Sequence, residues 1–353
     1  MRNYKVVQWS TGNVGMNAVK SVVERDNMEL VGLYAYSDKK AGKDAGEIVG
    51  LDKNIGVKAT KNIDEILSLD ADVVIHTPLA SLVYGENKDS DIDDICRLLA
   101  SGKNVITTVG YMYPKVYGPE LNGRLEEACK SGNSTFHSTG LNPGFFGDVL
   151  PLTMSSLSKS IERIHIREIS NFDIYPSPEV MFDIMGFGKT DEEFNKDAER
   201  FKFWISGLFK ELIQMIADGL EVELDEITEE LTLSYAENDL EPAAGTVKAG
   251  TIAGQLWQWA GVIEGEKRII HESVWRMFNT VSPDWPKGNH SITIDGEPAM
   301  YVEYEPHKWL DDGLLATAMH AVNAIPYIVN ASSGIKTFLD LPLMVGKGIF
   351  KTR

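Results

Sequence analysis

Short apolar runs alternate with amphipathic stretches along the first 140 residues of the chain. Apolar runs rich in β-branched residues are typical of strands buried on both faces of a sheet, and the stretches between them have helical spacing. Strands that alternate with helices favour an α/β fold with a doubly wound parallel sheet. The predicted strands are residues 5–9, 29–36, 71–77, 104–108 and 134–138, and the predicted helices are 16–24, 91–100 and 120–130.

The pattern changes after Pro151, where longer alternating segments joined by tight turns replace the regular succession of strand and helix. These segments predict an antiparallel sheet, interrupted by one long helix and followed by another. The predicted strands are 246–262 paired with 268–277 around a turn at 264–266, and 291–294 paired with 300–305 around Asp295 and Gly296; the helices are 201–216 and 313–328.

The net charge of the chain limits the kinds of molecule that it is expected to bind. The chain has 34 Lys and Arg residues against 52 Asp and Glu residues, a formal net charge of −18. This excess argues against nucleic acid and anionic membranes, whose phosphates need counter-charge, and leaves small molecules and other protein chains. Two cysteines make no disulfide framework, and neither a signal peptide nor a membrane span is recognisable, so we expect a cytoplasmic protein. Without CxxC or HExxH patterns, no metal is expected.

The strongest local motif lies between the first strand and the first helix. Gly12 and Gly15 fill the second and third positions of a dinucleotide-binding glycine turn, and Ser10 stands where the first glycine is usual. Glycines suit this place because the backbone N–H groups that open a helix must approach a pyrophosphate closely. The alternative is an ordinary tight turn. The expected cofactor-binding residues here are Ser10, Thr11, Gly12, Asn13, Val14 and Gly15.

The loop after the second strand bears on the choice of cofactor. Ser37, Lys39 and Lys40 can hold the 2'-phosphate of NADP(H), whereas Asp38 would repel it if its carboxylate pointed inward. The loop therefore favours NADP(H), with NAD(H) possible. A solvated turn is the alternative interpretation.

Residues just beyond the later strands complete the expected cofactor site, because open α/β sheets bind ligands at the carboxyl ends of their strands. Thr77, Pro78 and Thr108 lie at such ends. The turn that holds Asn142, Pro143 and Gly144 could put the Asn142 amide beside the nicotinamide carboxamide, since both groups donate and accept hydrogen bonds. The alternative is a turn between domains that needs no ligand.

Several motifs, in order along nearly the whole chain, resemble the dihydrodipicolinate-reductase-like oxidoreductases that include 2,4-diaminopentanoate dehydrogenase and the native amine dehydrogenases. The motifs are residues 7–15, SDKKAGKDAGEIVG (37–50), LASGKNVITT (99–108), GLNPGFFGDVLP (140–151), SPEVMFDIMGFG (177–188), and AVNAIP with GIKTFLDLP (321–342). The resemblance implies a Rossmann domain, an open antiparallel substrate domain, a nicotinamide cofactor and a homodimer. Asn323, within AVNAIP, joins the expected cofactor residues.

The resemblance also exposes one departure. Family members that aminate ketones look as if they carry a glutamate in the loop after the 104–108 strand, but residues 109–114 here have no carboxylate. The candidates for general acid–base work are therefore Tyr111, Tyr113 and His137, each with a purely structural role as the alternative. Glu168 and Glu179 could also reach inward from the second domain, but for Glu168 the favoured interpretation is an ion pair with a nearby arginine. Trp257, Trp259 and Trp275 either line an apolar substrate cavity or belong to the core.

Together these observations predict an NAD(P)H-dependent, amine-dehydrogenase-like oxidoreductase that reductively aminates a small ketone or aldehyde. The alternatives are a ketone or alcohol oxidoreductase that does not use ammonia, and a non-catalytic NADPH-binding protein. The expected domains are 1–145 for the dinucleotide, 146–310 for substrate and dimerisation, and 311–353 as a helix and tail that pack back on the first domain.

Overall fold

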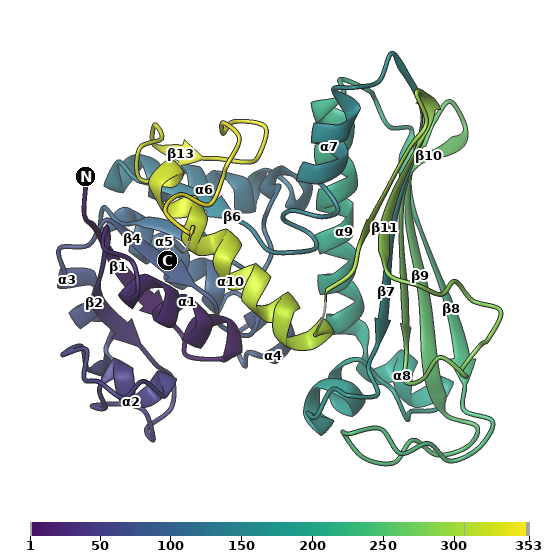
Figure 1. The fold of residues 1–353 in the computed structure, drawn as a ribbon, viewed down its shortest axis with the longest axis horizontal. Helices are drawn as coiled ribbons and strands as arrows, with labels where there is room; N and C mark the ends of the chain where they lie inside the picture. The colour runs from purple at the N-terminus through teal and green to yellow at the C-terminus, as the bar shows by residue number, and fades with distance from the viewer. Residues whose placement is uncertain (1, 307, 351–353) are drawn as a thin grey trace. The chain divides into compact units, whose positions relative to one another are not determined.

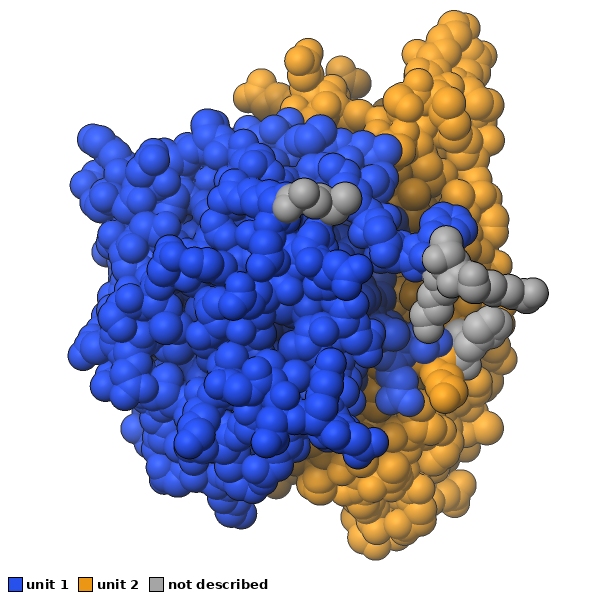
Figure 2. Space-filling view, turned by 60° about the vertical axis from the view of Figure 1, so that its left-hand side comes forward, with its two compact units in different colours: residues 1–145, 311–353 blue, residues 146–310 orange. Residues whose placement is uncertain are grey.

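The computed structural model describes residues 2–306 and 308–350, shown as a ribbon in Figure 1. The chain divides into two compact units, coloured separately in Figure 2. Unit 1 runs through Phe145 and resumes at Asp311, and unit 2 comprises Phe146–Leu310. The C-terminal segment is therefore grouped with the N-terminal part of the chain.

Unit 1 is built on a seven-stranded sheet in the order β13-β6-β5-β4-β1-β2-β3, in which every pairing is parallel. This confirms the prediction of a doubly wound parallel sheet. The strand order changes direction at β1, because β2 lies on one side of it and β4 on the other, and such a switch point is where open α/β sheets bind ligands. The strands are β1 (Tyr4–Trp9), β2 (Met28–Tyr34), β3 (Ala59–Thr60), β4 (Val73–His76), β5 (Asn104–Thr107), β6 (Thr135–Ser138) and β13 (Gly334–Ile335).

The C-terminal helix α10 (Trp309–Ile328) completes the core of unit 1. Ala318, Ala321, Val322 and Ile325 on this helix are fully buried, in the same cluster as residues of β1 and α1. Small and branched apolar side chains at helical spacing account for this close packing. The other helices of unit 1 are α1 (Asn13–Val23), α2 (Ala45–Val49), α3 (Ile63–Ser68), α4 (Ser81–Tyr84), α5 (Ser90–Ala100), the 3-10 helix η1 (Pro114–Tyr117) and α6 (Pro119–Gly132).

Unit 2 contains a six-stranded sheet in the order β12-β11-β7-β10-β9-β8. Four pairings are antiparallel, but β7 and β10 are parallel, so the sheet is mixed. Parallel neighbours need a long crossover, and here α9, β8 and β9 lie between the two strands in the chain. The strands are β7 (Ser160–Asn171), β8 (Glu226–Tyr235), β9 (Ile252–Ile263), β10 (Glu266–Arg276), β11 (His290–Glu297) and β12 (Met300–Tyr304).

Two predicted strand limits in unit 2 are wrong. The strand expected from residue 246 begins only at Ile252, because the residues before it form a turn closed by the bridge between Leu240 and Val247. Asp295 and Gly296 do not form the second turn either. They pair with Arg163 and Ile161 of β7, which moves the turn to residues 298–299.

The long helix α9 (Glu199–Gly219) covers one face of this sheet (Figure 1). Phe209 on α9 stacks against Trp259, with ring centroids 4.5 Å apart, and against His271 at 3.9 Å. Trp257 and Trp275 are also buried in this core, so the three tryptophans are core residues. The shorter helices are α7 (Val149–Ser155), the π-helix η2 (Glu179–Ile184) and α8 (Asp191–Asp197). Within the described residues, no helix combines the length and apolar character needed to cross a bilayer.

Candidate functional site

The turn between β1 and α1 has a backbone conformation that favours glycine at its first position. Ser10, at the position of the usual first glycine, has φ of +77°, in the left-handed region that favours glycine. The buried Gln8 side chain holds this turn, since its Nε2 donates to Ser10 O at 2.9 Å and to Thr77 Oγ1 at 2.8 Å. We did not predict this role of Gln8 from the sequence, although a polar residue inside an apolar strand indicates a side chain that makes buried hydrogen bonds.

The two glycines of the turn have different reasons to be glycine. A Cβ on Gly15 would lie 2.3 Å from Ser10 O, so this position is needed for packing of helix against strand. A Cβ on Gly12 would meet no atom within 4 Å. Gly12 is the N-cap residue that precedes α1, and the first turn of this helix has no side-chain cap and no acidic residue. The N–H groups that open the helix therefore lack a capping side chain, and a helix start of this kind suits a pyrophosphate. Thr11 is buried, Val14 is half-buried and Asn13 is exposed.

Replacing Ser10 with glycine is expected to raise the free energy of unfolding by up to about 1 kcal/mol, because glycine adopts a positive φ without steric cost. Urea unfolding would measure the change. Ser37→Gly is the control, since Ser37 does not have a positive φ and the substitution there only increases the freedom of the unfolded chain. A Ser10→Gly variant destabilised as much as the control would show that Ser10 is not strained.

One lysine side chain approaches the glycine turn from the loop after β2. Lys40 Nζ donates to Thr11 O at 2.8 Å and contacts Thr11 Oγ1 at 3.0 Å. Ser37 and Lys39 are exposed, and the Lys39 amide donates to Ser37 Oγ at 3.2 Å. Asp38 is also exposed and pairs with Lys61 at 2.6 Å. The structure therefore brings Lys40 to the turn and gives the Asp38 carboxylate a lysine partner.

Thr77, Pro78 and Thr108 follow β4 and β5, which are neighbouring strands. The buried Thr77 hydroxyl accepts a hydrogen bond from Gln8 Nε2 and donates one to Trp9 O at 3.3 Å. Because Gln8 Nε2 also donates to Ser10 O, Thr77 helps to hold the glycine turn in place. Pro78 and Thr108 are half-buried at the same edge of the sheet. Thr77 therefore lies beside the turn, and Pro78 and Thr108 lie at the same edge of the sheet.

The turn after β6 is held by the C-terminal helix. Gly144 has φ of +121°, and a Cβ there would lie 2.1 Å from Gly140 N, so the turn that contains Asn142 and Pro143 depends on glycine. Thr139 Oγ1 lies 2.6 Å from His320 Nδ1 of α10, and the Phe145 ring packs edge-on against His320 at 5.2 Å. Burial lowers the pKa of His320 to about 4, so the imidazole is neutral near pH 7. No sequence motif marked His320.

Asn323 is not brought to the glycine turn. Its Oδ1 accepts a hydrogen bond from Arg25 Nη2 at 2.8 Å, and Arg25 lies just beyond the C-terminal end of α1. The turn is at the other end of this 11-residue helix, which is about 16 Å long at about 1.5 Å per residue. The length of α1 thus separates Asn323 from the glycine turn, with whose residues we grouped it as cofactor-binding.

The three candidate acid–base residues lie on or after β5 and β6. Tyr111 and Tyr113 are buried in the loop after β5, where Ser138 Oγ donates to Gly110 O at 2.6 Å. His137 is fully buried in β6, and its Nδ1 lies 2.7 Å from Lys336 O, which fixes the proton on Nδ1. Burial lowers the pKa of His137 to about 4. These contacts give His137 a structural role in attaching the C-terminal segment.

The two glutamates of unit 2 differ in environment. Glu168 on β7 accepts a hydrogen bond from Trp275 Nε1 at 2.9 Å, while the adjacent Arg167 pairs with Glu272 at 2.6 Å. Glu179 is exposed at the start of η2. Among the residues that the structure describes, no group of His, Cys, Asp and Glu is arranged to hold a metal ion.

Comparison with known proteins identifies the family. Residues 145–349 match the model of the 2,4-diaminopentanoate dehydrogenase C-terminal domain, and residues 6–86 match that of the dihydrodipicolinate reductase N-terminus. The chain belongs to the 2,4-diaminopentanoate dehydrogenase family. This confirms the resemblance seen in the sequence and the expectation of an NAD(P)-dependent oxidoreductase.

The names of individual similar proteins are consistent with this family. An amine dehydrogenase of Streptomyces virginiae is 30% identical over 96% of both chains. A 2,4-diaminopentanoate dehydrogenase of Acetoanaerobium sticklandii is 30% identical over 68% of this chain and 67% of its own. The structure of an amine dehydrogenase from Mycobacterium smegmatis matches with a TM-score of 0.80 at 20% identity, and the match covers 98% of this chain and 97% of that one. This last likeness shows that the fold is shared.

Proposed function

We propose that this protein is an NAD(P)H-dependent amine dehydrogenase that reductively aminates a small ketone or aldehyde and, in reverse, oxidatively deaminates the amine. The observation that carries the proposal is the glycine turn at the switch point of a parallel sheet, in a chain 30% identical to an amine dehydrogenase over almost its full length. When bound, the nicotinamide cofactor supplies hydride transfer.

The residues of unit 1 fit such a cofactor. The open space in front of Gly12 is a cradle that any Cβ would fill, so the amides that begin α1 bind the pyrophosphate. The Asn142 amide, on the turn held by His320, hydrogen bonds the nicotinamide carboxamide. Tyr111 and Tyr113 are the phenols that move a proton during the reaction. His137 is less suited, because its Nδ1 is already committed to Lys336 O.

NADP(H) is the preferred cofactor in this proposal, because Lys39 and Lys40 supply positive charge near the expected 2'-phosphate and Asp38 is paired with Lys61. Lys39→Met is expected to raise the Kd of NADPH about tenfold and leave that of NADH unchanged, since a hydrogen bond to a charged group contributes about 1.5–3 kcal/mol. Titration of cofactor fluorescence measures both constants. Lys43→Met is the control, because Lys43 pairs with Glu47. Equal weakening of both cofactors would contradict the assignment.

A second function is favoured by the absence of a carboxylate in residues 109–114. Without a group to orient ammonia, the enzyme would reduce a ketone directly to an alcohol. NADPH oxidation with 2-pentanone, cyclohexanone and hexanal, each with and without ammonium chloride, separates the two. Turnover that depends on ammonium supports the amine dehydrogenase, and turnover that does not supports the ketone reductase. NADPH binding without turnover would indicate a non-catalytic protein.

The chain is further proposed to act in the cytoplasm and to form a homodimer, of which the homodimer is implied by the family resemblance. Light scattering of the purified protein distinguishes a dimer from a 39.1 kDa monomer. A single species at the monomer mass at micromolar concentration would contradict the dimer.

A further inference from the structure

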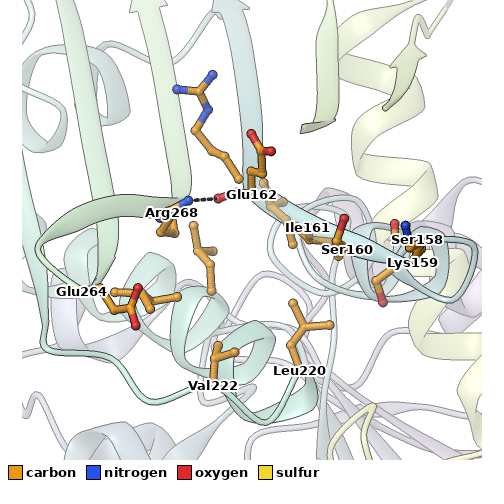
Figure 3. Close-up of a pocket in the computed structure, with 14 residues that line it drawn as sticks. Ser158, Lys159, Ser160, Ile161, Glu162, Leu220, Val222, Glu264 and Arg268 are labelled. Atoms are coloured by element: carbon orange, nitrogen blue, oxygen red, sulfur yellow. Dashed lines mark hydrogen bonds between the residues drawn. The ribbon is translucent and has the colours of Figure 1, made fainter. Parts of the chain in front are cut away.

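A pocket of about 560 Å³ lies at one end of the unit 2 sheet, and all of its lining residues belong to unit 2. The start of β7, the turn between β9 and β10, and the segment that follows α9 surround it. Figure 3 shows Leu220 and Val222 below, Glu264 on the left, and Ser158 and Lys159 on the right. A volume of this size is typical of a small-molecule site, and no residue that we assign to the dinucleotide or to proton transfer lines it.

One wall of the pocket is aliphatic. Ile164 of β7 and Ile269 of β10 are buried neighbours across the parallel pair, and they form the part of this wall that belongs to the sheet. Leu220 and Val222, which follow α9, are only half-buried, so their side chains keep apolar surface open to a ligand. Burial of apolar surface strengthens binding by about fourfold for each buried CH2 group. The wall therefore favours a ligand with an alkyl chain.

Hydrogen bonds hold the rim of the pocket in place. Gly265 N, in the turn between β9 and β10, donates to Asp225 Oδ2 at 2.9 Å. Arg268 Nη1 donates to Glu162 O at 3.1 Å, the bond drawn as a dashed line in Figure 3. These bonds tie the turn to the segment before β8 and tie β10 to β7. Because the pocket is formed before a ligand arrives, binding has little ordering cost.

The charged side chains of the pocket favour a cation. Its cationic side chains each pair with a carboxylate outside the lining: Lys159 with Glu297 at 2.6 Å, Arg163 with Asp295 at 2.6 Å, and Arg268 with Glu266 at 2.9 Å. The two lining carboxylates, Glu162 and Glu264, are exposed and form no ion pair within the part of the chain that the structure describes. A cation in the pocket thus meets two unpaired negative charges, whereas an anion must compete for cations that already have partners.

A serine of the lining lacks a hydrogen-bond partner. Ser158 Oγ is shielded from solvent, and no described residue offers it a donor or an acceptor. Shielded hydroxyls are normally satisfied, so Ser158 has hydrogen-bonding capacity available for a polar group held in the pocket. A hydroxyl oxygen accepts hydrogen bonds through two lone pairs, so it suits an N–H donor as well as the carboxylates do.

We propose that this pocket is a second small-molecule site, which reversibly binds a primary alkylammonium ion. The alkyl chain lies against the aliphatic wall, and the nitrogen is held by the charges of Glu162 and Glu264. The three N–H donors of such an ion match in number the two carboxylates and the Ser158 hydroxyl. The inference goes beyond the proposed function and does not depend on it, because the lining contains none of the residues assigned to the reaction.

Calorimetric titration of the protein without dinucleotide at pH 7.0 tests the class of ligand. Hexan-1-amine, hexan-1-ol and sodium hexanoate are the probes, because they have the same chain length and differ in charge. We expect hexan-1-amine to bind at least tenfold more tightly than hexan-1-ol, and hexanoate to bind more weakly than either. Octan-1-amine is expected to bind about tenfold more tightly than hexan-1-amine. An amine that does not bind, or that binds no more tightly than the alcohol or hexanoate, would overturn the inference.

Substitutions test whether the amine binds at this pocket. The double variant Glu162→Gln, Glu264→Gln keeps the shape of both side chains, and it is expected to weaken hexan-1-amine binding at least tenfold and to leave hexan-1-ol within twofold of wild type. Val222→Trp fills the pocket and is expected to weaken both ligands, with its melting temperature as a check on folding. Glu237→Gln is the matched control, since Glu237 is exposed beyond the opposite end of β8.

Unchanged hexan-1-amine binding in the double variant would overturn the inference while the proposed function stands. A protein that binds the amine as expected but turns over no amine with NADP+ would contradict the proposed function alone.

Discussion

Replacing Gly12 with valine is expected to weaken NADPH binding at least about 100-fold without unfolding the protein. The valine side chain would occupy the open space in front of the first turn of α1, where no atom lies within 4 Å of an added Cβ. It would separate the helix amides from the pyrophosphate, and two lost hydrogen bonds to a charged group are together worth about 3 kcal/mol or more. Fluorescence titration with NADPH and urea unfolding measure the two effects.

Gly15→Ala is the comparison that separates binding from folding. Its Cβ would lie 2.3 Å from Ser10 O and 2.9 Å from Gln8 Nε2, so the turn itself must move. Overpacking of this kind costs about 1–3 kcal/mol of unfolding free energy. Gly12→Val is expected to lose affinity with normal stability, and Gly15→Ala to lose both. Normal NADPH affinity in Gly12→Val would show that no pyrophosphate lies against these amides.

Acidification is expected to destabilise unit 1 steeply below about pH 6.5. Burial lowers the pKa of His137 to about 4 and that of His76 to about 3, from an ordinary value of 6.5. Between these values and pH 6.5 the unfolded chain binds protons that the folded chain does not, so stability present at neutral pH is lost as pH falls. Each histidine contributes a slope of about 1.4 kcal/mol per pH unit, which gives about 3 kcal/mol per unit for both.

Urea unfolding at pH 7.0, 6.0 and 5.0 measures this slope. Asp91 Oδ1 lies 3.9 Å from His76 Nε2, but burial still holds the pKa of His76 at about 3, so both histidines contribute their slopes over this range. His137→Gln is expected to flatten the dependence, because glutamine can still donate to Lys336 O but does not titrate. A free energy of unfolding that stays constant from pH 7.0 to 5.0 would contradict the assignment of neutral, buried histidines.

The fold of unit 1 could be predicted from the sequence because strands such as β2 and β4 are short, largely apolar runs that alternate with stretches of helical spacing. The same reasoning did not find β7 or β8 in unit 2. In β7 the apolar alternation stops after Ile166, where Glu168 and Ser170 occupy the core face. In β8, Glu229 interrupts the alternation in the same way. Polar residues on the inner face remove the signal on which strand prediction depends.

The positions of candidate-site residues could be inferred where a local motif exists, but not where the contact is long-range. The glycine turn and the Lys40 loop are close in sequence to the strands that position them, so their places could be inferred. His320 reaches Thr139 across 181 positions of sequence, and no local pattern reports such a contact. Asn323, one helical turn further along α10, was assigned from the motif around it, but its side chain bonds Arg25 instead.

Calorimetric titration of the purified protein with NADPH and with NADH tests the central claim most directly. The account predicts one molecule bound per chain, NADPH more tightly than NADH, and a matching rise in melting temperature for each. No heat of binding and no thermal shift with either dinucleotide would contradict the assignment of the β1–α1 turn as a pyrophosphate site, and with it the proposed enzyme.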